Sequence, residues 1–324
     1  MRRILKTIYG QLARFPAVER WREAWRRNVE LRYWPWYRLK PTRLGIEPDT
    51  TCYKHELVVS LTSFPARIHL VHYTIYSLLK QSLKPNRLVL WLGEENFPSK
   101  EKDLPKTLLA LKQFGLEIRW CKDWKSAKKL IPSLRKWPDA IVVTADDDLW
   151  YPRKWLQSLY QSWLSNERNI HCGGIHPIAL EDDGKPMSYA EWGWNPHDSF
   201  PSFQNTQVGA FGALYPPHCL HPDVLDGDEF LRVSPTSDDF WFWAMAVRSN
   251  TRVQLAPPPR QPPVAIPGSS ATPALSAING KQGGNDLCMD NLLHAYPELL
   301  DRLVAEPRQE VTPWGGKPKT PARK

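Results

Sequence analysis

The sequence has no apolar run that approaches the roughly 20 residues of a membrane-spanning helix. Its five cysteines lie far apart, and no C-x-x-C pair occurs among them. Because their number is odd and the chain is not small, disulfides and a zinc–cysteine site are disfavoured and a reducing compartment is favoured. The first residues are basic, but no apolar signal-peptide core follows them. We therefore expect a cytoplasmic protein.

Several motifs that mark enzyme classes are also missing. Neither G-x-G-x-x-G nor G-x-x-x-x-G-K-[ST] occurs, so the dinucleotide fingerprint and the P-loop are excluded. The nine histidines show no H-x-x-x-H or H-E-x-x-H spacing, which disfavours a zinc hydrolase. No G-x-S-x-G is present to support a serine nucleophile.

The composition is that of a globular protein. The chain has 324 residues, 42% of them hydrophobic and 24% charged, which is enough for one large domain or two small ones. Its net charge of +9 suits an anionic partner such as a nucleotide, a nucleic acid or an anionic membrane surface. The 16 tryptophans are expected mainly in the core, with some left to stack on sugar rings or lie at a membrane interface.

Residues 1–50 form a basic, aromatic extension. On a helical wheel the apolar residues at 4, 5, 8, 12 and 15 share one arc, and basic residues occupy the opposite side. Such a cationic amphipathic helix can lie on an anionic membrane, so residues 1–40 predict peripheral contact with the inner face of the cell membrane. The alternative is a helix packed on its own domain or on a protein partner. The tail at 307–324 is basic and proline-rich and is expected to be disordered.

From residue 56 onward, strand and helix patterns alternate. Apolar runs predict strands at 57–61, 87–92, 116–120 and 140–144, and helical periodicity is found at 71–81, 104–114, 126–136 and 152–164. This alternation predicts an α/β fold with a mostly parallel, Rossmann-like sheet flanked by helices. The second half is less regular. It predicts strands at 170–180, 187–194 and 252–256, and a glycine-bearing turn that leads into a strand at 208–217. It also predicts helices at 237–248, 285–296 and 297–305, and a loop at 257–273.

Three consecutive acids, Asp146, Asp147 and Asp148, follow the buried run 141–145. Like charges at this spacing are best tolerated with a cation among them, and α/β folds place ligands at strand ends. Mg²⁺ and Mn²⁺ prefer oxygen ligands and complete their shells with substrate phosphates. We therefore predict a divalent-metal site that holds a phosphorylated ligand. The alternative is a solvated acidic turn or a cap for the helix that begins near Pro152.

A second acidic pair, Asp238-Asp239, opens the predicted helix 237–248. Acids in this position can cap the helix, or one of them, preferably Asp239, can take a proton from an acceptor hydroxyl.

Other candidates lie on the predicted loops and helices. Serine and threonine hydroxyls and Arg67 follow the first strand, where the hydroxyls could hold a ribose and Arg67 a phosphate. Lys128 or Lys129 could also reach a phosphate, and the alternative is that these lysines are solvated on a helix surface. Gly209 and Gly212 would let the backbone approach a ligand. Three tryptophans are candidate sugar platforms, with core packing as the alternative: Trp192, Trp194 and Trp241.

Taken in order, these segments resemble nucleotide-sugar glycosyltransferases of the GT-A fold. They are most similar to bacterial enzymes of surface-polysaccharide or lipopolysaccharide synthesis. The matching pieces are 59–68, 88–92, 117–121, 144–148, 214–217, 236–244 and 281–286. The resemblance implies a GT-A domain over 51–306, with a nucleotide-binding half at 51–165 and an acceptor half at 166–306.

The resemblance also implies roles for individual residues. Asp146 and Asp148 would hold Mn²⁺ or Mg²⁺ on the sugar-nucleotide diphosphate, with Asp147 beside them. Asp239 would act as the base toward the acceptor if the reaction is inverting, with Asp238 next to it. The donor pocket would be lined by residues at the end of the first strand: Thr62, Ser63 and Arg67. The acceptor side would be the segment Gly209 to Gly212, in which related sequences are nearly all glycine and this chain has Phe211.

These features predict a metal-dependent hexosyltransferase-type enzyme that moves a sugar from a nucleotide diphosphate sugar to a hydroxyl of a glycan or glycolipid, with no nucleic-acid partner. One alternative is a nucleotidyltransferase acting on sugar phosphates, which would need a glycine-rich loop after the first strand that residues 60–67 lack. The other alternative is a non-catalytic, membrane-attached glycan-binding protein, against which both acidic clusters count.

Overall fold

A computed structural model of the chain describes residues 41–194, 200–257, 262–269, 279–280 and 282–307. The amphipathic helix predicted within residues 1–40 and nearly all of the predicted tail lie outside the described residues. Within the described part, none of the helices combines the length and the apolar character needed to cross a membrane.

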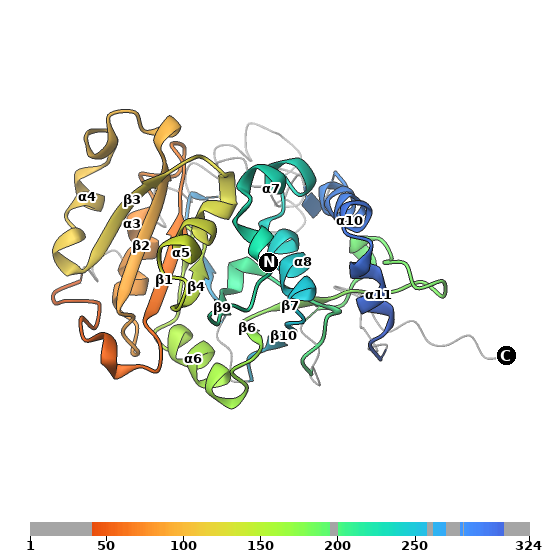
Figure 1. The fold of residues 1–324 in the computed structure, drawn as a ribbon. Helices are drawn as coiled ribbons and strands as arrows, with labels where there is room; N and C mark the ends of the chain where they lie inside the picture. The colour runs from red at the N-terminus through yellow and green to blue at the C-terminus, as the bar shows by residue number, and fades with distance from the viewer. Residues whose placement is uncertain (1–40, 195–199, 258–261, 270–278, 281, 308–324) are drawn as a thin grey trace, which may run out of the picture.

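The fold is built on a seven-stranded sheet (Figure 1). Its strands are β1 (Leu57–Thr62), β2 (Arg87–Gly93), β3 (Leu116–Cys121), β4 (Ile141–Ala145), β6 (Ile170–Cys172), β9 (Ala213–Tyr215) and β10 (Val253–Leu255). Their order is β10-β6-β9-β4-β1-β2-β3, and in this sheet every pairing is parallel except the two made by β9. The prediction of an α/β fold with a mostly parallel sheet is confirmed.

The direction of strand addition reverses at β1. The chain adds β2 and then β3 on one side of β1, and then places β4 on the other side. In open α/β sheets, ligands bind in the crevice outside the carboxyl ends of the strands at this type of switch point. The register that pairs Leu61 with Ala145 puts the end of β1 beside the three acids that follow β4.

Side chains alternate between two apolar clusters on opposite faces of the sheet, as strand geometry requires. In β4, Ile141 and Val143 belong to one cluster and Val142 to the other. The first face is covered by α3 (Val71–Leu79), α4 (Lys106–Leu109) and α6 (Trp155–Ser165). The second is covered by α5 (Ile131–Lys136), α7 (Gly227–Val233) and α8 (Asp238–Arg248). Beyond α8 lie α10 (Gly284–Ala295) and α11 (Glu298–Val304), at the opposite end of the molecule from α4 (Figure 1).

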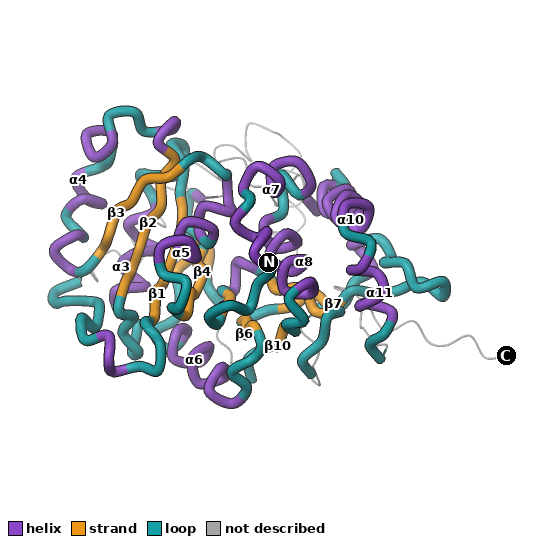
Figure 2. The backbone as a smooth tube through the Cα atoms, viewed as in Figure 1, coloured by secondary structure: helices purple, strands orange, loops and turns teal. Residues whose placement is uncertain are grey.

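Several predicted elements are broken up. The helix expected at 104–114 is α4 followed by a 3₁₀ turn, η5 (Lys112–Phe114), and that at 126–136 is the 3₁₀ turn η6 (Lys125–Lys129) followed by α5. The strand expected at 170–180 is two short strands, β6 and β7 (Ile175–Pro177), and β7 pairs with the unpredicted β8 (Asn205–Gln207). Most of the described chain between β7 and β8 is loop (Figure 2).

The prediction of a strand at 187–194 is wrong. This segment is loop with a 3₁₀ turn, η7 (Tyr189–Glu191). The rings of Tyr189 and Trp192 both pack on Phe240, with centroids 6.0 and 5.4 Å away. Residues three apart lie on one side of a 3₁₀ turn but on opposite sides of a strand, so this packing favours the turn.

The loop expected at 257–273 also contains a short strand. This strand, β11 (Val264–Ala265), pairs with β5 (Leu149–Trp150) directly after the three acids, and the N–H of Ile266 donates to the carbonyl of Asp148 at 2.8 Å. This part of the loop therefore lies against the segment that begins at Asp148.

Candidate active site

The central acid, Asp147, is turned into the protein at the switch point. Its Oδ2 accepts a hydrogen bond from the Ser63 hydroxyl at 2.5 Å, and its Oδ1 accepts one from Arg67 Nη1 at 2.7 Å. Its carbonyl accepts from the hydroxyl of Thr74 on α3 at 2.9 Å. Both carboxylate oxygens are thus engaged, so Asp147 joins the end of β1 to the end of β4 and leaves its two neighbours to face outward.

Asp146 and Asp148 keep part of their surface, with side chains 29% and 24% exposed. Asp148 lies 3.0 Å from Arg67 Nη1, which it shares with Asp147. Burial and the charge of Asp146 raise the pKa of Asp148 to about 6. The single guanidinium therefore does not fully compensate the acids around it.

Lys129 is the cation on the other side of Asp146. Its Nζ donates to Asp146 Oδ1 at 2.8 Å and lies 3.0 Å from Asp238 Oδ2, and its side chain is 5% exposed. Burial alone would lower the pKa of Lys129, but Asp146, Asp238 and Asp239 raise it well above its usual value. A charged Lys129 therefore connects the two acidic clusters, which are about 90 residues apart in the sequence.

Asp239 lies in the first turn of α8 and faces the segment Gly209–Phe211, the 3₁₀ turn η8. Its Oδ2 accepts a hydrogen bond from the Gly209 N–H at 2.9 Å. A Cβ at position 209 would lie 2.7 Å from Asp239 Oδ1 and 3.0 Å from Lys129 Nζ, so a larger residue there would displace the Asp239 carboxylate. Burial, together with the charge of Asp238, raises the pKa of Asp239 to about 7. This value is suited to a group that exchanges protons near neutral pH.

The Gly209–Phe211 turn is also tied to the first acidic cluster. The Tyr151 hydroxyl accepts from the Asp146 N–H at 2.8 Å and donates to the Ala210 carbonyl at 3.3 Å. The Trp155 indole donates to the Phe211 carbonyl at 2.7 Å. Hydrogen bonds with Asp239, Tyr151 and Trp155 therefore hold this turn between the acids that follow β4 and Asp239.

Gly212 ends this turn with φ +83°, and a Cβ there would lie 2.3 Å from Trp155 Cζ2. We predict that Gly212→Ala lowers the free energy of unfolding by about 3 kcal/mol, since a strained backbone and an overpacked ring each cost about 1–3 kcal/mol. Denaturant unfolding measures this loss. Gly280→Ala is the matched control, because among the described residues no atom beyond its chain neighbours lies within 4 Å of its Cβ position. An equal effect of the two substitutions would contradict the prediction.

The site as a whole is acidic within a basic protein. Five carboxylates interact here with two basic groups, Arg67 and Lys129. The acids are Asp146, Asp147, Asp148, Asp238 and Asp239. If all are ionised, three negative charges remain uncompensated, which is an electrostatic environment that favours a divalent cation.

The residues present fit a metal that shares its shell with a substrate. Among the residues that the structure describes, no group of three or more His, Cys, Asp and Glu side chains converges on one point. Mg²⁺ is usually held by one or two carboxylates together with substrate phosphates, however, and the partly exposed Asp146 and Asp148 match that pattern. Asp147 does not, because both of its oxygens are already used.

Two predicted site residues lie elsewhere. Lys128 is 2% exposed and pairs with Asp123 beyond the end of β3, so it is not the lysine of the acidic site. Trp241 is completely buried, and its indole donates to the Val224 carbonyl at 3.3 Å. Trp241 therefore packs in the core and cannot serve as an acceptor platform.

The remaining predicted residues lie at the site or beside it. Ser63 and Arg67 contact Asp147, whereas the Thr62 hydroxyl donates to the Trp91 carbonyl at 2.9 Å and ties β1 to β2. Phe211 packs its ring on Trp194 with centroids 5.4 Å apart. The space beside Gly209, where a larger residue would carry its side chain, is occupied by the Asp239 carboxylate. The sequence predicts instead that the backbone of Gly209 approaches a ligand.

The sequence pattern does not single out two residues that the structure places at the centre of the site, Lys129 and Tyr151. Lys128 and Lys129 are adjacent lysines, and no feature of the pattern separates them. Tyr151 follows the three acids closely, and its position next to a charged cluster is the signal that could have indicated a buried hydroxyl there. Both residues act by linking segments that are distant in the sequence.

No family model and no curated protein matches the chain. Solved structures similar to it include a mannosyltransferase from Pyrobaculum calidifontis in complex with GDP-Man and Mn²⁺, at 15% identity and a TM-score of 0.41, with 85% of this chain and 80% of that chain covered. TarS 1–349 from S. aureus is similar at 12% identity and a TM-score of 0.43, with coverages of 76% and 69%. A 4-diphosphocytidyl-2C-methyl-D-erythritol synthase is similar at 13% identity and a TM-score of 0.41, with coverages of 68% and 97%. These likenesses are slight, so the function proposed below rests on the residues of this chain.

Proposed function

We propose that this chain is a metal-dependent glycosyltransferase that moves a sugar from a nucleotide diphosphate sugar to a hydroxyl of a glycan or glycolipid acceptor. The observation that carries this proposal is the pairing of two acidic clusters of different character at the switch point of the sheet. One cluster is partly exposed and suited to a metal and a diphosphate. The other contains a carboxyl group with a pKa of about 7, which suits proton transfer.

On the donor side, Asp146 and Asp148 would hold Mn²⁺ or Mg²⁺, which would offset the charge on the leaving diphosphate. Asp147, Ser63 and Arg67 would position those two acids, since their own polar groups already bind one another. Lys129 would keep Asp146 in place from the opposite side.

On the acceptor side, Asp239 would take the proton of the attacking hydroxyl. Its Oδ2 is held by the Gly209 N–H, and within the described chain its Oδ1 accepts no hydrogen bond, so Oδ1 is available to the acceptor. A base with a pKa near 7 is both substantially ionised at neutral pH and strong enough to accept a proton in the transition state. The Gly209–Phe211 turn would form the wall between donor and acceptor.

A nucleotidyltransferase acting on sugar phosphates receives less support from the same geometry. Such an enzyme would need a glycine-bearing, basic loop after β1 to hold a triphosphate. Residues 60–67 contain no glycine, and their one basic side chain, Arg67, is bound to Asp147 and Asp148.

The proposal also covers the acceptor and the location of the protein in the cell. A polysaccharide or lipopolysaccharide acceptor would be reached at the inner face of the membrane, with the protein itself in the cytoplasm. The contact with an anionic membrane would be made by residues 1–40, which lie outside the described residues, and it stays a prediction.

A thermal-shift screen tests the donor and metal assignment. We expect one of the UDP-, GDP- or CMP-sugars to stabilise the protein when Mn²⁺ is present, by about 2.7 kcal/mol at 100 times its Kd. Asp148→Ala should lose the Mn²⁺-dependent part of this shift, whereas Asp301→Ala, on the exposed side of α11, should retain it. A normal rate of sugar-nucleotide turnover by Asp148→Ala without Mg²⁺ or Mn²⁺ would refute the metal assignment, and stabilisation by CTP alone would favour a nucleotidyltransferase.

A further inference from the structure

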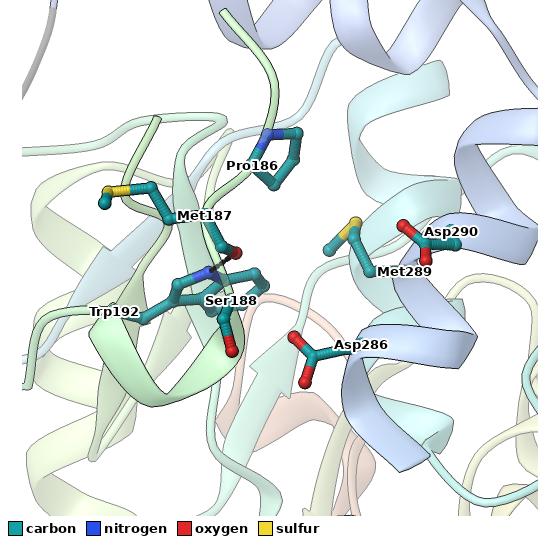
Figure 3. A pocket seen from close by; sticks show the side chains of 7 residues that line it. All are labelled: Pro186, Met187, Ser188, Trp192, Asp286, Met289 and Asp290. Carbon is teal, nitrogen blue, oxygen red and sulfur yellow. Dashed lines mark hydrogen bonds between the residues drawn. The ribbon is translucent and has the colours of Figure 1, made fainter. Parts of the chain in front are cut away.

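A pocket of about 260 Å³ lies between the loop that contains η7 and the helix α10 (Figure 3). It is lined by Pro186, Met187, Ser188, Trp192, Asp286, Met289 and Asp290. Figure 3 shows Asp286 reaching from α10 toward Ser188, with Asp290 one turn further along the helix beside Met289. The pocket contains none of the acids of the catalytic site described above.

One wall of this pocket is nevertheless connected through Tyr189 to the first turn of α8, which carries Asp239. The Tyr189 N–H donates to Asp286 Oδ1 at 2.7 Å, and the Tyr189 ring packs on Phe240, the residue after Asp239. Burial raises the pKa of the Tyr189 phenol to about 12, and the charge of Asp239 adds to this effect. A ligand in the pocket would therefore contact a segment that packs on the helical turn carrying the proposed base.

The polar groups of the pocket require a ligand that donates hydrogen bonds. Within the described residues, neither Asp286 nor Asp290 forms an ion pair, and an ionised carboxylate can only accept. Asp286 keeps Oδ2 available to a ligand as far as the described part of the chain is concerned, because the hydrogen bond from Tyr189 uses Oδ1. Two carboxylates on one helix face repel an anionic ligand, so a phosphate or a nucleotide does not suit this pocket.

The other walls are apolar. Met289 and Pro186 offer CH and thioether surfaces that adapt to an irregular ligand, whereas Figure 3 shows the side chain of Met187 directed away from α10. Trp192 is 1% exposed, and its indole N–H donates to the Met187 carbonyl at 2.9 Å. Trp192 therefore forms a buried support behind the pocket, and it is not the open stacking platform that the sequence suggested.

We infer that this pocket binds a sugar ring of the glycan acceptor, and this inference rests on the function proposed above. A sugar ring combines several hydroxyl donors with an apolar CH face, which matches the two carboxylates and the CH surfaces of Met289 and Pro186. The volume falls just below the range of about 300–1,000 Å³ that is usual for drug-sized ligands, so it suits one ring of a longer chain. The ring is neutral or carries an amine.

The test compares the wild type with the double variant Asp286→Asn/Asp290→Asn, which retains shape and an oxygen for the Tyr189 N–H but loses both charges. Saturation-transfer NMR measures binding of three neutral methyl α-glycosides (glucoside, galactoside and mannoside) and of the methyl glycoside of glucosamine. We expect at least one of the four to bind the wild type and to lose at least tenfold in affinity in the double variant. Asp301→Asn is the control and should bind as the wild type does.

An enzymatic measurement separates this inference from the proposed function. With a nucleotide sugar that the wild type hydrolyses, the double variant should show a ratio of glycoside transfer to donor hydrolysis that is at least tenfold lower. Binding that is lost in the double variant of a protein that turns over no nucleotide sugar would support the pocket and refute the proposed function. Absence of binding of all four probes to the wild type, or equal binding to both proteins, would overturn the pocket.

Discussion

Replacing Asp239 with asparagine is expected to lower the rate of sugar transfer by about 10³-fold, within the range of about 10²–10⁴ that a positioned general base supplies. The asparagine keeps the hydrogen bond from the Gly209 N–H but cannot take up the proton of the acceptor hydroxyl. The effect should appear in kcat, with the KM for the nucleotide sugar nearly unchanged, because under the proposed function the donor would lie on the other side of the Gly209–Phe211 turn.

The same substitution should stabilise the protein. The pKa of Asp239 is about 7 in the folded state and near its ordinary value of 3.8 in the unfolded state. Ionising this carboxyl therefore costs the folded state more than the unfolded state, and the cost grows as pH rises from about 4 to about 7. Asparagine carries no such cost, so Asp239→Asn should have the higher melting temperature at pH 8 and little advantage at pH 4.

The pH dependence of the wild-type activity is a third test of the role of Asp239. Since a base must be ionised to act, kcat/KM should rise with pH through about 7 and then level off. Asp239→Asn should lack this rise. Asp228→Asn is a matched control because Asp228 also lies in the first helical turn, of α7, but is exposed. A variant Asp239→Asn with wild-type activity would exclude Asp239 as the base.

The second large effect is expected at Lys129. Substitution by methionine shortens the side chain by one atom and removes its charge, which leaves the buried Asp238 and the partly exposed Asp146 without their shared cation. Removing one partner of a buried ion pair costs about 3–5 kcal/mol, because the remaining charge is uncompensated. We expect Lys129→Met to lose about this much free energy of unfolding at pH 8 and less at pH 5, where the carboxylates can take up protons.

A double variant distinguishes this cause from a general packing defect. Asp238→Asn added to Lys129→Met should restore part of the lost stability, because it removes one of the two charges that Lys129 no longer compensates. Lys122→Met provides the control, since Lys122 pairs with Asp228 on the surface and its loss should leave the denaturation midpoint unchanged. Equal stability of Lys129→Met and the wild type would show that Lys129 does not hold the two clusters together.

The sequence by itself determined the sheet and the two acidic clusters. Apolar β-branched runs such as residues 141–145 have few alternatives to a buried strand, and their alternation with helical patterns indicates parallel order. Three carboxylates directly after such a run are a local feature, so Asp146 and Asp148 could be proposed as metal ligands before any contact was known. Asp239 could likewise be placed at the start of a helix.

Only the tertiary structure decided which side chains meet. Lys128 and Lys129 are neighbours with the same chemistry, and the irregular turn η6 sends one to Asp123 and the other to the acidic site. Trp192 and Trp241 are aromatic residues of the predicted acceptor half, yet both are buried. Local sequence predicts hydrophobic periodicity and charge, but the direction of a single side chain depends on the elements packed around it, and those come from distant parts of the chain.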